Sequence, residues 1–95
     1  MLPFESPEVE VEIGEKIEEI KLWELVLFND EVNTFDYVID TLVEVCEHTS
    51  HQAEQCTLLI HYKGKCGVKV GEFEELVPMR NEICRRGLSA EIEFR

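Results

Sequence analysis

The sequence predicts a small α+β domain with the element order β-α-α-β-α-β, in which a three-stranded antiparallel sheet packs on three helices. Residues 21–28 are rich in Trp, Leu and Val, as a buried strand is. Residues 35–46 carry apolar side chains at helical spacing, and residues 88–94 alternate apolar with polar side chains. Because 95 residues are enough for a single core only, these patterns indicate one domain.

The first strand is expected over 21–28 and ends where the polar residues 29–31 follow. Asn33 or Thr34 can cap the next helix, because their side chains accept hydrogen bonds from N–H groups of the first turn. Apolar residues then recur at intervals of three and four, which places them on one helical face. They are Phe35, Val38, Ile39, Leu42 and Cys46.

Residues 48–50 end this helix, and Ser50 can cap a second one. The second helix is expected to be buried on more than one side, since apolar residues fill its middle. They are Ala53, Cys56, Thr57, Leu58, Leu59 and Ile60. Gly64 and Gly67 are expected to bound a turn, and a short strand is expected over 66–70.

A third helix is expected from Glu72 onward. Its inward residues are Phe73, Leu76, Val77 and Ile83. Pro78 fits only near the first turn or with a kink, because proline lacks an N–H and clashes with the preceding turn. Gly87 is expected just past the helix end, behind two arginines that favour a C-terminus. The last strand, over 88–94, turns Leu88, Ala90, Ile92 and Phe94 inward.

The charge balance excludes some classes of function, because 21 acidic and nine basic residues give a net charge of −12. Nucleic-acid binding needs a basic patch, and docking on anionic membrane needs clustered Lys and Arg. Residues 1–20 alone hold seven Glu and one Lys. We expect a flexible acidic extension there, or a segment that orders on a partner or sheet edge, followed by a core domain over 21–95.

Neither a secretory signal nor a membrane span is visible in the sequence. The N-terminus lacks a basic region followed by an apolar one. The longest apolar stretch, residues 25–28, is far shorter than the roughly 20 residues that cross a bilayer. We therefore expect a cytoplasmic protein.

Four cysteines and three histidines raise the question of a metal site. The cysteines lie at positions 46, 56, 66 and 84, and the histidines at positions 48, 51 and 61. No CxxC or HxxxH pair occurs, although tetrahedral zinc sites usually contain such close pairs. We expect reduced thiols that pack as small apolar groups, and no metal or other cofactor.

Catalytic motifs are missing as well: the chain has no P-loop, GxGxxG, GxSxG or HExxH. A Cys–His pair that meets only in the fold stays open, but we expect a protein that is not an enzyme. The best candidate for a site is the polar loop Asn29-Asp30-Glu31, which leaves a buried strand and enters a helix. His61 ends another helix. These residues also fit a plain turn, a cap and an exposed histidine.

Several segments around this loop form one ordered pattern. Residues 27–31 read Leu-Phe-Asn-Asp-Glu, and residues 35–42 read Phe-Asp-Tyr-Val-Ile-Asp-Thr-Leu. His61-Tyr-Lys-Gly-Lys, then Cys66-Gly-Val, then the final strand follow in the same order. Together these segments resemble the signature of the ClpS family, and the resemblance covers residues 22–94. ClpS proteins are adaptors that bring substrates with an N-degron, an N-terminal Leu, Phe, Tyr or Trp, to a Clp ATPase–protease.

The resemblance implies roles for particular residues. The free α-amino group of the substrate would be bound by Asn29, Asp30, Glu31 and His61. The hydrophobic side chain of the degron would occupy a pocket of Leu27, Phe28, Asn33, Phe35, Val38, Thr57, Ile60 and Leu88. Glu72 and Glu75 would contact the Clp ATPase, of the ClpA or ClpC type, and the acidic extension would influence that ATPase.

Several positions depart from the family pattern. Glu31 stands where an Asp is common, Phe35 where a Met or branched aliphatic residue is usual, Asn33 where a Thr is frequent, and Thr57 where a Met is frequent. These changes imply an altered preference among Leu, Phe, Tyr and Trp. Val77 replaces a Lys of the ATPase contact, and Pro78 follows it.

An alternative from another class is a non-catalytic docking domain on the same scaffold, without N-degron recognition. The C-terminal domain of the bacterial ribosomal stalk protein has a related element order and only docks proteins.

Overall fold

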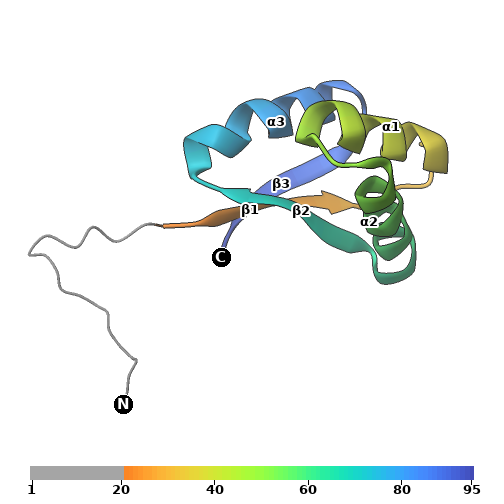
Figure 1. Ribbon diagram of the computed structural model, residues 1–95, viewed down its shortest axis with the longest axis horizontal. Coiled ribbons are helices and arrows are strands. Elements are labelled where there is room, and N and C mark those ends of the chain that lie inside the picture. The colour runs from red at the N-terminus through yellow and green to blue at the C-terminus, as the bar shows by residue number, and fades with distance from the viewer. Residues whose placement is uncertain (1–20) are drawn as a thin grey trace, which may run out of the picture.

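The computed structural model describes residues 21–95, so the expected flexible extension of residues 1–20 lies outside the described residues. The elements follow in the order predicted from sequence, and the predicted α+β fold class is confirmed. They are β1 (Trp23–Phe28), α1 (Phe35–Cys46), α2 (Ser50–Lys63), β2 (Lys65–Gly71), α3 (Phe73–Arg85) and β3 (Ser89–Phe94) (Figure 1). Within 21–95, no helix has the length and apolar character needed to cross a membrane.

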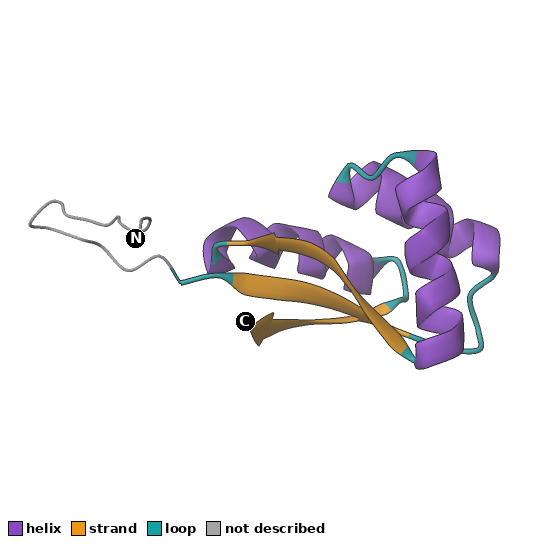
Figure 2. Ribbon diagram, turned by 60° about the horizontal axis from the view of Figure 1, so that its bottom comes forward, coloured by secondary structure: helices purple, strands orange, loops and turns teal. Residues whose placement is uncertain are grey.

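The sheet has the strand order β2-β1-β3, and both pairings are antiparallel. Leu27 of β1 lies between Cys66 of β2 and Ala90 of β3. The register with β2 shifts between Leu25 and Val26, as at a β-bulge. Helices α1 and α3 lie on one side of the sheet, and α2 packs against α1 and β2 (Figures 1 and 2).

The core forms where β1 meets the helices. Leu25 and Leu27 of β1 are completely buried, together with Leu42 of α1 and with Leu76 and Ile83 of α3. These side chains alternate along β1 and recur at helical spacing in α1 and α3, which is why their apolar pattern was visible in the sequence. Because β1 is the central strand, its C-terminal end at Phe28 is held firmly where the polar loop begins.

The N-cap of α1 agrees with the prediction, and the N-cap of α2 differs from it. Thr34 caps α1, since its side chain accepts a hydrogen bond from the Tyr37 N–H at 3.1 Å. Thr49, and not Ser50, caps α2, where it forms a capping box with Gln52. The prediction for Ser50 was wrong by one residue because adjacent Thr and Ser are equally able to cap.

Two further predictions about α2 and the following turn were wrong. Leu59 is 43% exposed, and the fully buried residues of α2, Ala53, Thr57 and Ile60, share one face. Gly67 lies inside β2 rather than at a turn, and the Glu24 side chain crosses the space that a Cβ would occupy there. Gly64 alone makes the turn, with a φ of 92° that favours glycine.

Helix α3 contains Pro78 in its interior, beyond the first turn in which proline fits most easily. Gly87 follows the end of the helix, as expected. Gly87 has a φ of 92°, and the Leu88 N–H donates to the Ile83 carbonyl while the Gly87 N–H donates to the Cys84 carbonyl. This double hydrogen bond is the Schellman motif. It turns the chain sharply, so that Leu88 returns to the core beside the polar loop.

Candidate functional site

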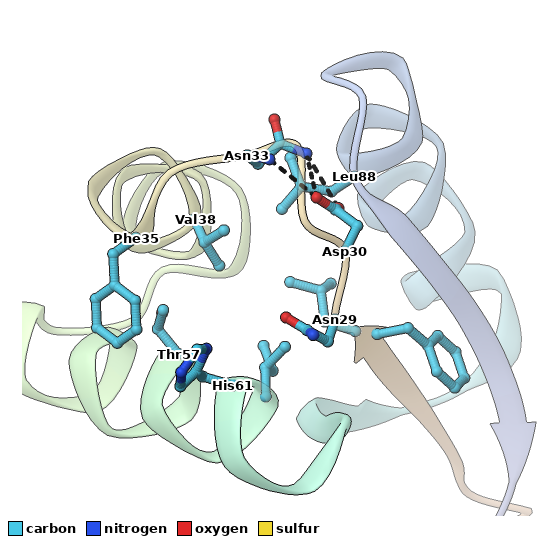
Figure 3. A pocket seen from close by; sticks show the side chains of 11 residues that line it. Asn29, Asp30, Asn33, Phe35, Val38, Thr57, His61 and Leu88 are labelled. Atoms are coloured by element: carbon cyan, nitrogen blue, oxygen red, sulfur yellow. Dashed lines mark hydrogen bonds between the residues drawn. The ribbon is translucent and has the colours of Figure 1, made fainter.

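A pocket opens where the C-terminal end of β1, the start of α1, the end of α2 and the start of β3 meet. Its volume is about 70 Å³. It is lined by Leu27, Phe28, Asn29, Asp30, Asn33, Phe35, Val38, Thr57, Ile60, His61 and Leu88 (Figure 3). All eight residues expected for the hydrophobic pocket therefore line one cavity, together with three of the four expected for amine binding.

The pocket has an apolar floor. Leu27, Ile60 and Leu88 come from β1, α2 and the residue before β3, and each is at least 95% buried. The Thr57 hydroxyl is also buried, and it donates to the Ala53 carbonyl at 2.7 Å within α2. The floor thus belongs to the packed core and offers a ligand mainly carbon surface.

Asp30 organises the loop between β1 and α1. Its Oδ1 accepts from the N–H groups of Val32 and Asn33, at 3.0 and 2.9 Å, and both carboxylate oxygens accept from the Asn33 side-chain amide. Partial burial raises the pKa of Asp30, but these hydrogen bonds outweigh it and leave the pKa below its ordinary value. Asp30 is therefore a charged residue that fixes the loop as well as lining the pocket.

Asn33 also ties this loop to a distant turn. Its side-chain amide donates to the Gly87 carbonyl at 3.1 Å, and the Tyr37 hydroxyl donates to the Arg86 carbonyl at 2.8 Å. Both bonds join α1 and its preceding loop to the end of α3. Asn33 was expected in the pocket, but its link to Gly87 was not predicted, because the partners are 54 residues apart.

The remaining polar lining residues are Asn29 and His61. The backbone N–H of Asn29 donates to the Gly64 carbonyl at 2.9 Å, which anchors the end of β1 to the end of α2. Its side chain lies at the pocket between the loop and α2 (Figure 3). The exposed His61 ring is contacted edge-on by Phe35, at 6.2 Å between ring centres, and by Tyr62 at 5.2 Å.

Glu31 is the one expected amine-binding residue that does not line the pocket. It is exposed on the same loop, directly after Asp30.

The two expected ATPase-contact residues lie elsewhere, at the start of α3. Glu72 precedes the first turn and Glu75 lies in it, and both are exposed. The Glu75 side chain lies over Gly71, where any Cβ would clash with it.

An aromatic cluster beside this acidic surface was missed by the sequence analysis. Trp23 contacts Phe73 and Phe94 edge-on, with ring centres 5.1 and 4.9 Å apart. Phe73 and Phe94 are 45% and 63% exposed, so the prediction that both face inward was wrong. Both rings pack on Trp23 rather than among the fully buried core residues, and periodicity alone does not show where along an element the core ends.

The cysteines do not form a metal site with their neighbours. Among residues 21–95, no group of three or more His, Cys, Asp or Glu side chains could hold a metal ion. Burial raises the pKa of Cys46 to about 11, and burial together with the neighbouring Cys56 raises the pKa of Cys66 to about 12. Only Cys46 is fully buried, whereas all four cysteines were expected to be.

Comparison with known proteins identifies the family. The sequence model of the ClpS family, described as ATP-dependent Clp protease adaptor protein ClpS, matches residues 18–91. The chain belongs to the ClpS family. ClpS proteins are adaptors that act with Clp proteases and are not enzymes, which confirms the expected non-catalytic role.

Curated relatives named ATP-dependent Clp protease adapter protein ClpS are bacterial. One from Nitratidesulfovibrio vulgaris is 30% identical over 76 residues, which cover 78% of this chain and 76% of the relative. Another from Helicobacter hepaticus is 36% identical over 69 residues, or 70% of each chain. The alignments with both relatives cover most of the described domain.

The fold of this ClpS protein is similar to that of Agrobacterium tumefaciens ClpS2, which was solved bound to L-phenylalaninamide. The TM-score is 0.77 at 20% sequence identity, over 81% of this chain and 100% of that one. At this identity the likeness supports the ClpS fold alone.

Proposed function

We propose that this ClpS protein binds the free α-amino group and the large hydrophobic side chain of an N-degron, and delivers the substrate to a Clp ATPase–protease. The observation that carries the proposal is the composition of one cavity. Polar Asn29, Asp30 and His61 lie on the same pocket as a floor of buried aliphatic residues. A hydrophobic N-terminal residue has matching groups, because its charged α-amino group and its apolar side chain are attached to the same Cα atom.

The polar residues suit an ammonium group. An α-ammonium has three donors and needs oriented acceptors, and a carboxylate strengthens such bonds. Asn29 offers an amide oxygen, His61 an imidazole nitrogen in its neutral form, and Asp30 an ionised carboxylate that its loop already holds in place. Glu31 would join them by turning its longer side chain toward the mouth of the pocket.

The apolar floor suits the side chain of the same residue. Burying a Leu or Phe side chain there contributes roughly 1.5–3 kcal/mol to binding. The backbone of the degron would then leave through the mouth, beside Phe35 and His61. A related structure, that of Agrobacterium tumefaciens ClpS2, holds an aromatic amino-acid amide, which supports a ligand of this class.

Delivery would use the opposite end of the domain. We place the contact with a ClpA- or ClpC-type ATPase at Glu72 and Glu75, with the acidic residues 1–20 acting on the same ATPase. The fully formed start of α3 and the exposure of both side chains support this contact. The cytoplasm is the compartment in which such an adaptor would work.

The test is binding of a fluorescent peptide that begins with Leu, measured by anisotropy, beside the same peptide with an acetylated N-terminus. The free peptide is expected to bind and the acetylated one to fail, because acetylation removes the positive charge and two of the three N–H donors. Equal binding of both would contradict amine recognition. If neither binds while the protein still associates with a Clp ATPase, the alternative of a plain docking domain is favoured.

A further inference from the structure

Two partly buried cysteines meet between α2 and β2, which pack directly on each other. Cys56 belongs to α2 and Cys66 to β2, and both pack against the same hydrophobic core. Cys56 lies on the buried side of its helix, since it is three residues after Ala53 and four before Ile60, both of which are buried. Cys66 lies two residues before buried Val68, so it is on the face of β2 that is turned toward the core.

The two thiols interact directly. Burial, followed by a side-chain hydrogen bond with Cys56, raises the pKa of Cys66 to about 12. The Cys66 Sγ also lies 3.3 Å from the Gly67 carbonyl oxygen, which limits the directions in which this thiol points. A disulfide forms only between cysteines whose side chains approach each other closely, and two thiols in hydrogen-bonding contact meet this requirement.

The other two cysteines are placed less well for such a bond. Cys46 is only 1% exposed, and Cys56 acts on it through charge rather than through a hydrogen bond. Cys84 belongs to α3, where its Sγ donates to the Ala90 carbonyl at 3.7 Å. Cys56 and Cys66 are free thiols and both are partly exposed, so a small oxidant has access to them.

We propose that Cys56 and Cys66 form a redox-modification site, at which a hydroperoxide converts the two thiols into a reversible disulfide between α2 and β2. The inference goes beyond N-degron binding and does not depend on it. In a reducing compartment such a bond is transient, as redox-sensing disulfides are. Cys56 precedes Thr57, and Cys66 pairs with Leu27, so the bond would form beside two residues that line the pocket.

The reaction is a two-electron oxidation of the two thiols. The Cys56 sulfur attacks one oxygen of hydrogen peroxide, the O–O bond breaks, and the products are a sulfenic acid and water. The Cys66 sulfur then attacks the Cys56 sulfur, so that the S–S bond forms and the S–O bond breaks. The departing hydroxyl takes the Cys66 proton and leaves as a second water. Because the raised pKa keeps Cys66 protonated at neutral pH, the first attack is assigned to Cys56.

The experiment treats the full chain, at low protein concentration, with a small excess of hydrogen peroxide and measures the intact mass without reductant. A loss of about 2 Da that dithiothreitol reverses is expected, because a disulfide lacks the two thiol hydrogens. Digestion with trypsin and with a protease that cuts after Glu separates Cys46 from Cys56, since Glu residues at positions 47 and 54 lie between them. The linked peptides are expected to contain Cys56 and Cys66.

Cys56→Ser and Cys66→Ser are each expected to abolish the mass loss. Cys84→Ser is the matched control in α3 and is expected to keep it. Circular dichroism shows whether each variant is folded, and the wild-type mass and peptide map test the proposal without any variant. A wild-type protein that gains oxygen atoms and forms no disulfide within the chain would overturn the inference. A peptide map that links Cys56 to Cys46 would overturn it as well.

Discussion

The side-chain amide of Asn33 lies 3.2 and 3.0 Å from the two carboxylate oxygens of Asp30, and 3.1 Å from the Gly87 carbonyl oxygen. One amide thus joins the loop after β1 to the turn before β3. Those two strands are neighbours in the sheet, so these hydrogen bonds hold the loop and the turn together at one side of the pocket.

Replacing Asn33 with Ala is expected to lower both stability and peptide affinity. The substitution removes the bonds to Asp30 and Gly87, and a hydrogen bond to a charged group is worth about 1.5–3 kcal/mol when buried. Because this site is only partly buried, we expect a decrease of about 1 kcal/mol in the free energy of unfolding. Urea denaturation measures it. Asp40→Ala, an exposed acid in α1, is the control, and an equal loss there would contradict the role of the Asn33 bonds.

Asp30→Asn is expected to make the stability of the protein less dependent on acid pH. The folded-state pKa of Asp30 lies below its ordinary value of 3.8, because its hydrogen bonds outweigh partial burial. The ionised carboxylate therefore stabilises the fold above that value, and this contribution is lost as pH falls through the lower, folded-state pKa. Unfolding curves between neutral pH and pH 2 should show wild type and variant converging at the acid end. A constant difference across the range would contradict the prediction.

His61→Ala is expected to weaken binding of a Leu peptide severalfold while the fold stays intact, because His61 is exposed at the pocket. The variant loses the ring nitrogen that would accept a hydrogen bond from the ammonium. His51→Ala removes an exposed histidine at the start of α2 that does not line the pocket, and it serves as the control. Unchanged affinity in His61→Ala would remove this residue from the site.

Glu72→Gln and Glu75→Gln are each expected to reduce affinity for a ClpA- or ClpC-type ATPase a few fold, with peptide binding unchanged. Both substitutions keep the shape of the side chain and remove only the charge. Glu54→Gln, on the exposed face of α2, is the matched control for net charge. Sedimentation of the adaptor with the ATPase gives the affinity. A loss equal to that of Glu54→Gln would mean that the start of α3 is not the docking surface.

The elements could be predicted because each carries a local signal. The period-two pattern of residues 88–94 and the helical spacing from Phe35 to Cys46 follow from one face being buried. Where two adjacent residues can both act as an N-cap, the prediction was wrong by one position, since Thr49 caps α2 in place of Ser50. Gly67 was misplaced because glycine occurs both in turns and where another side chain crosses a strand, and here Glu24 does so.

The site was predictable in part. Resemblance to the ClpS signature gave the residues that line the pocket, but the link between Asn33 and Gly87 depends on how two distant segments pack, and no local pattern encodes it. The exposure of Glu31 outside the pocket lining is likewise a property of the folded loop. Sequence gives the identity of such side chains, and only the fold gives the space between them.

Strand β1 joins the two proposed contact regions. The pocket begins at its C-terminal end, at Phe28, and the start of α3 lies by its other end, where Trp23 contacts Phe73. Six residues of strand span roughly 20 Å. The substrate and the Clp ATPase would therefore bind without steric competition, and the central strand would keep the distance between their two binding sites constant. The two proposed contacts could then be occupied together in one ternary complex, because the ATPase would not cover the pocket that holds the substrate.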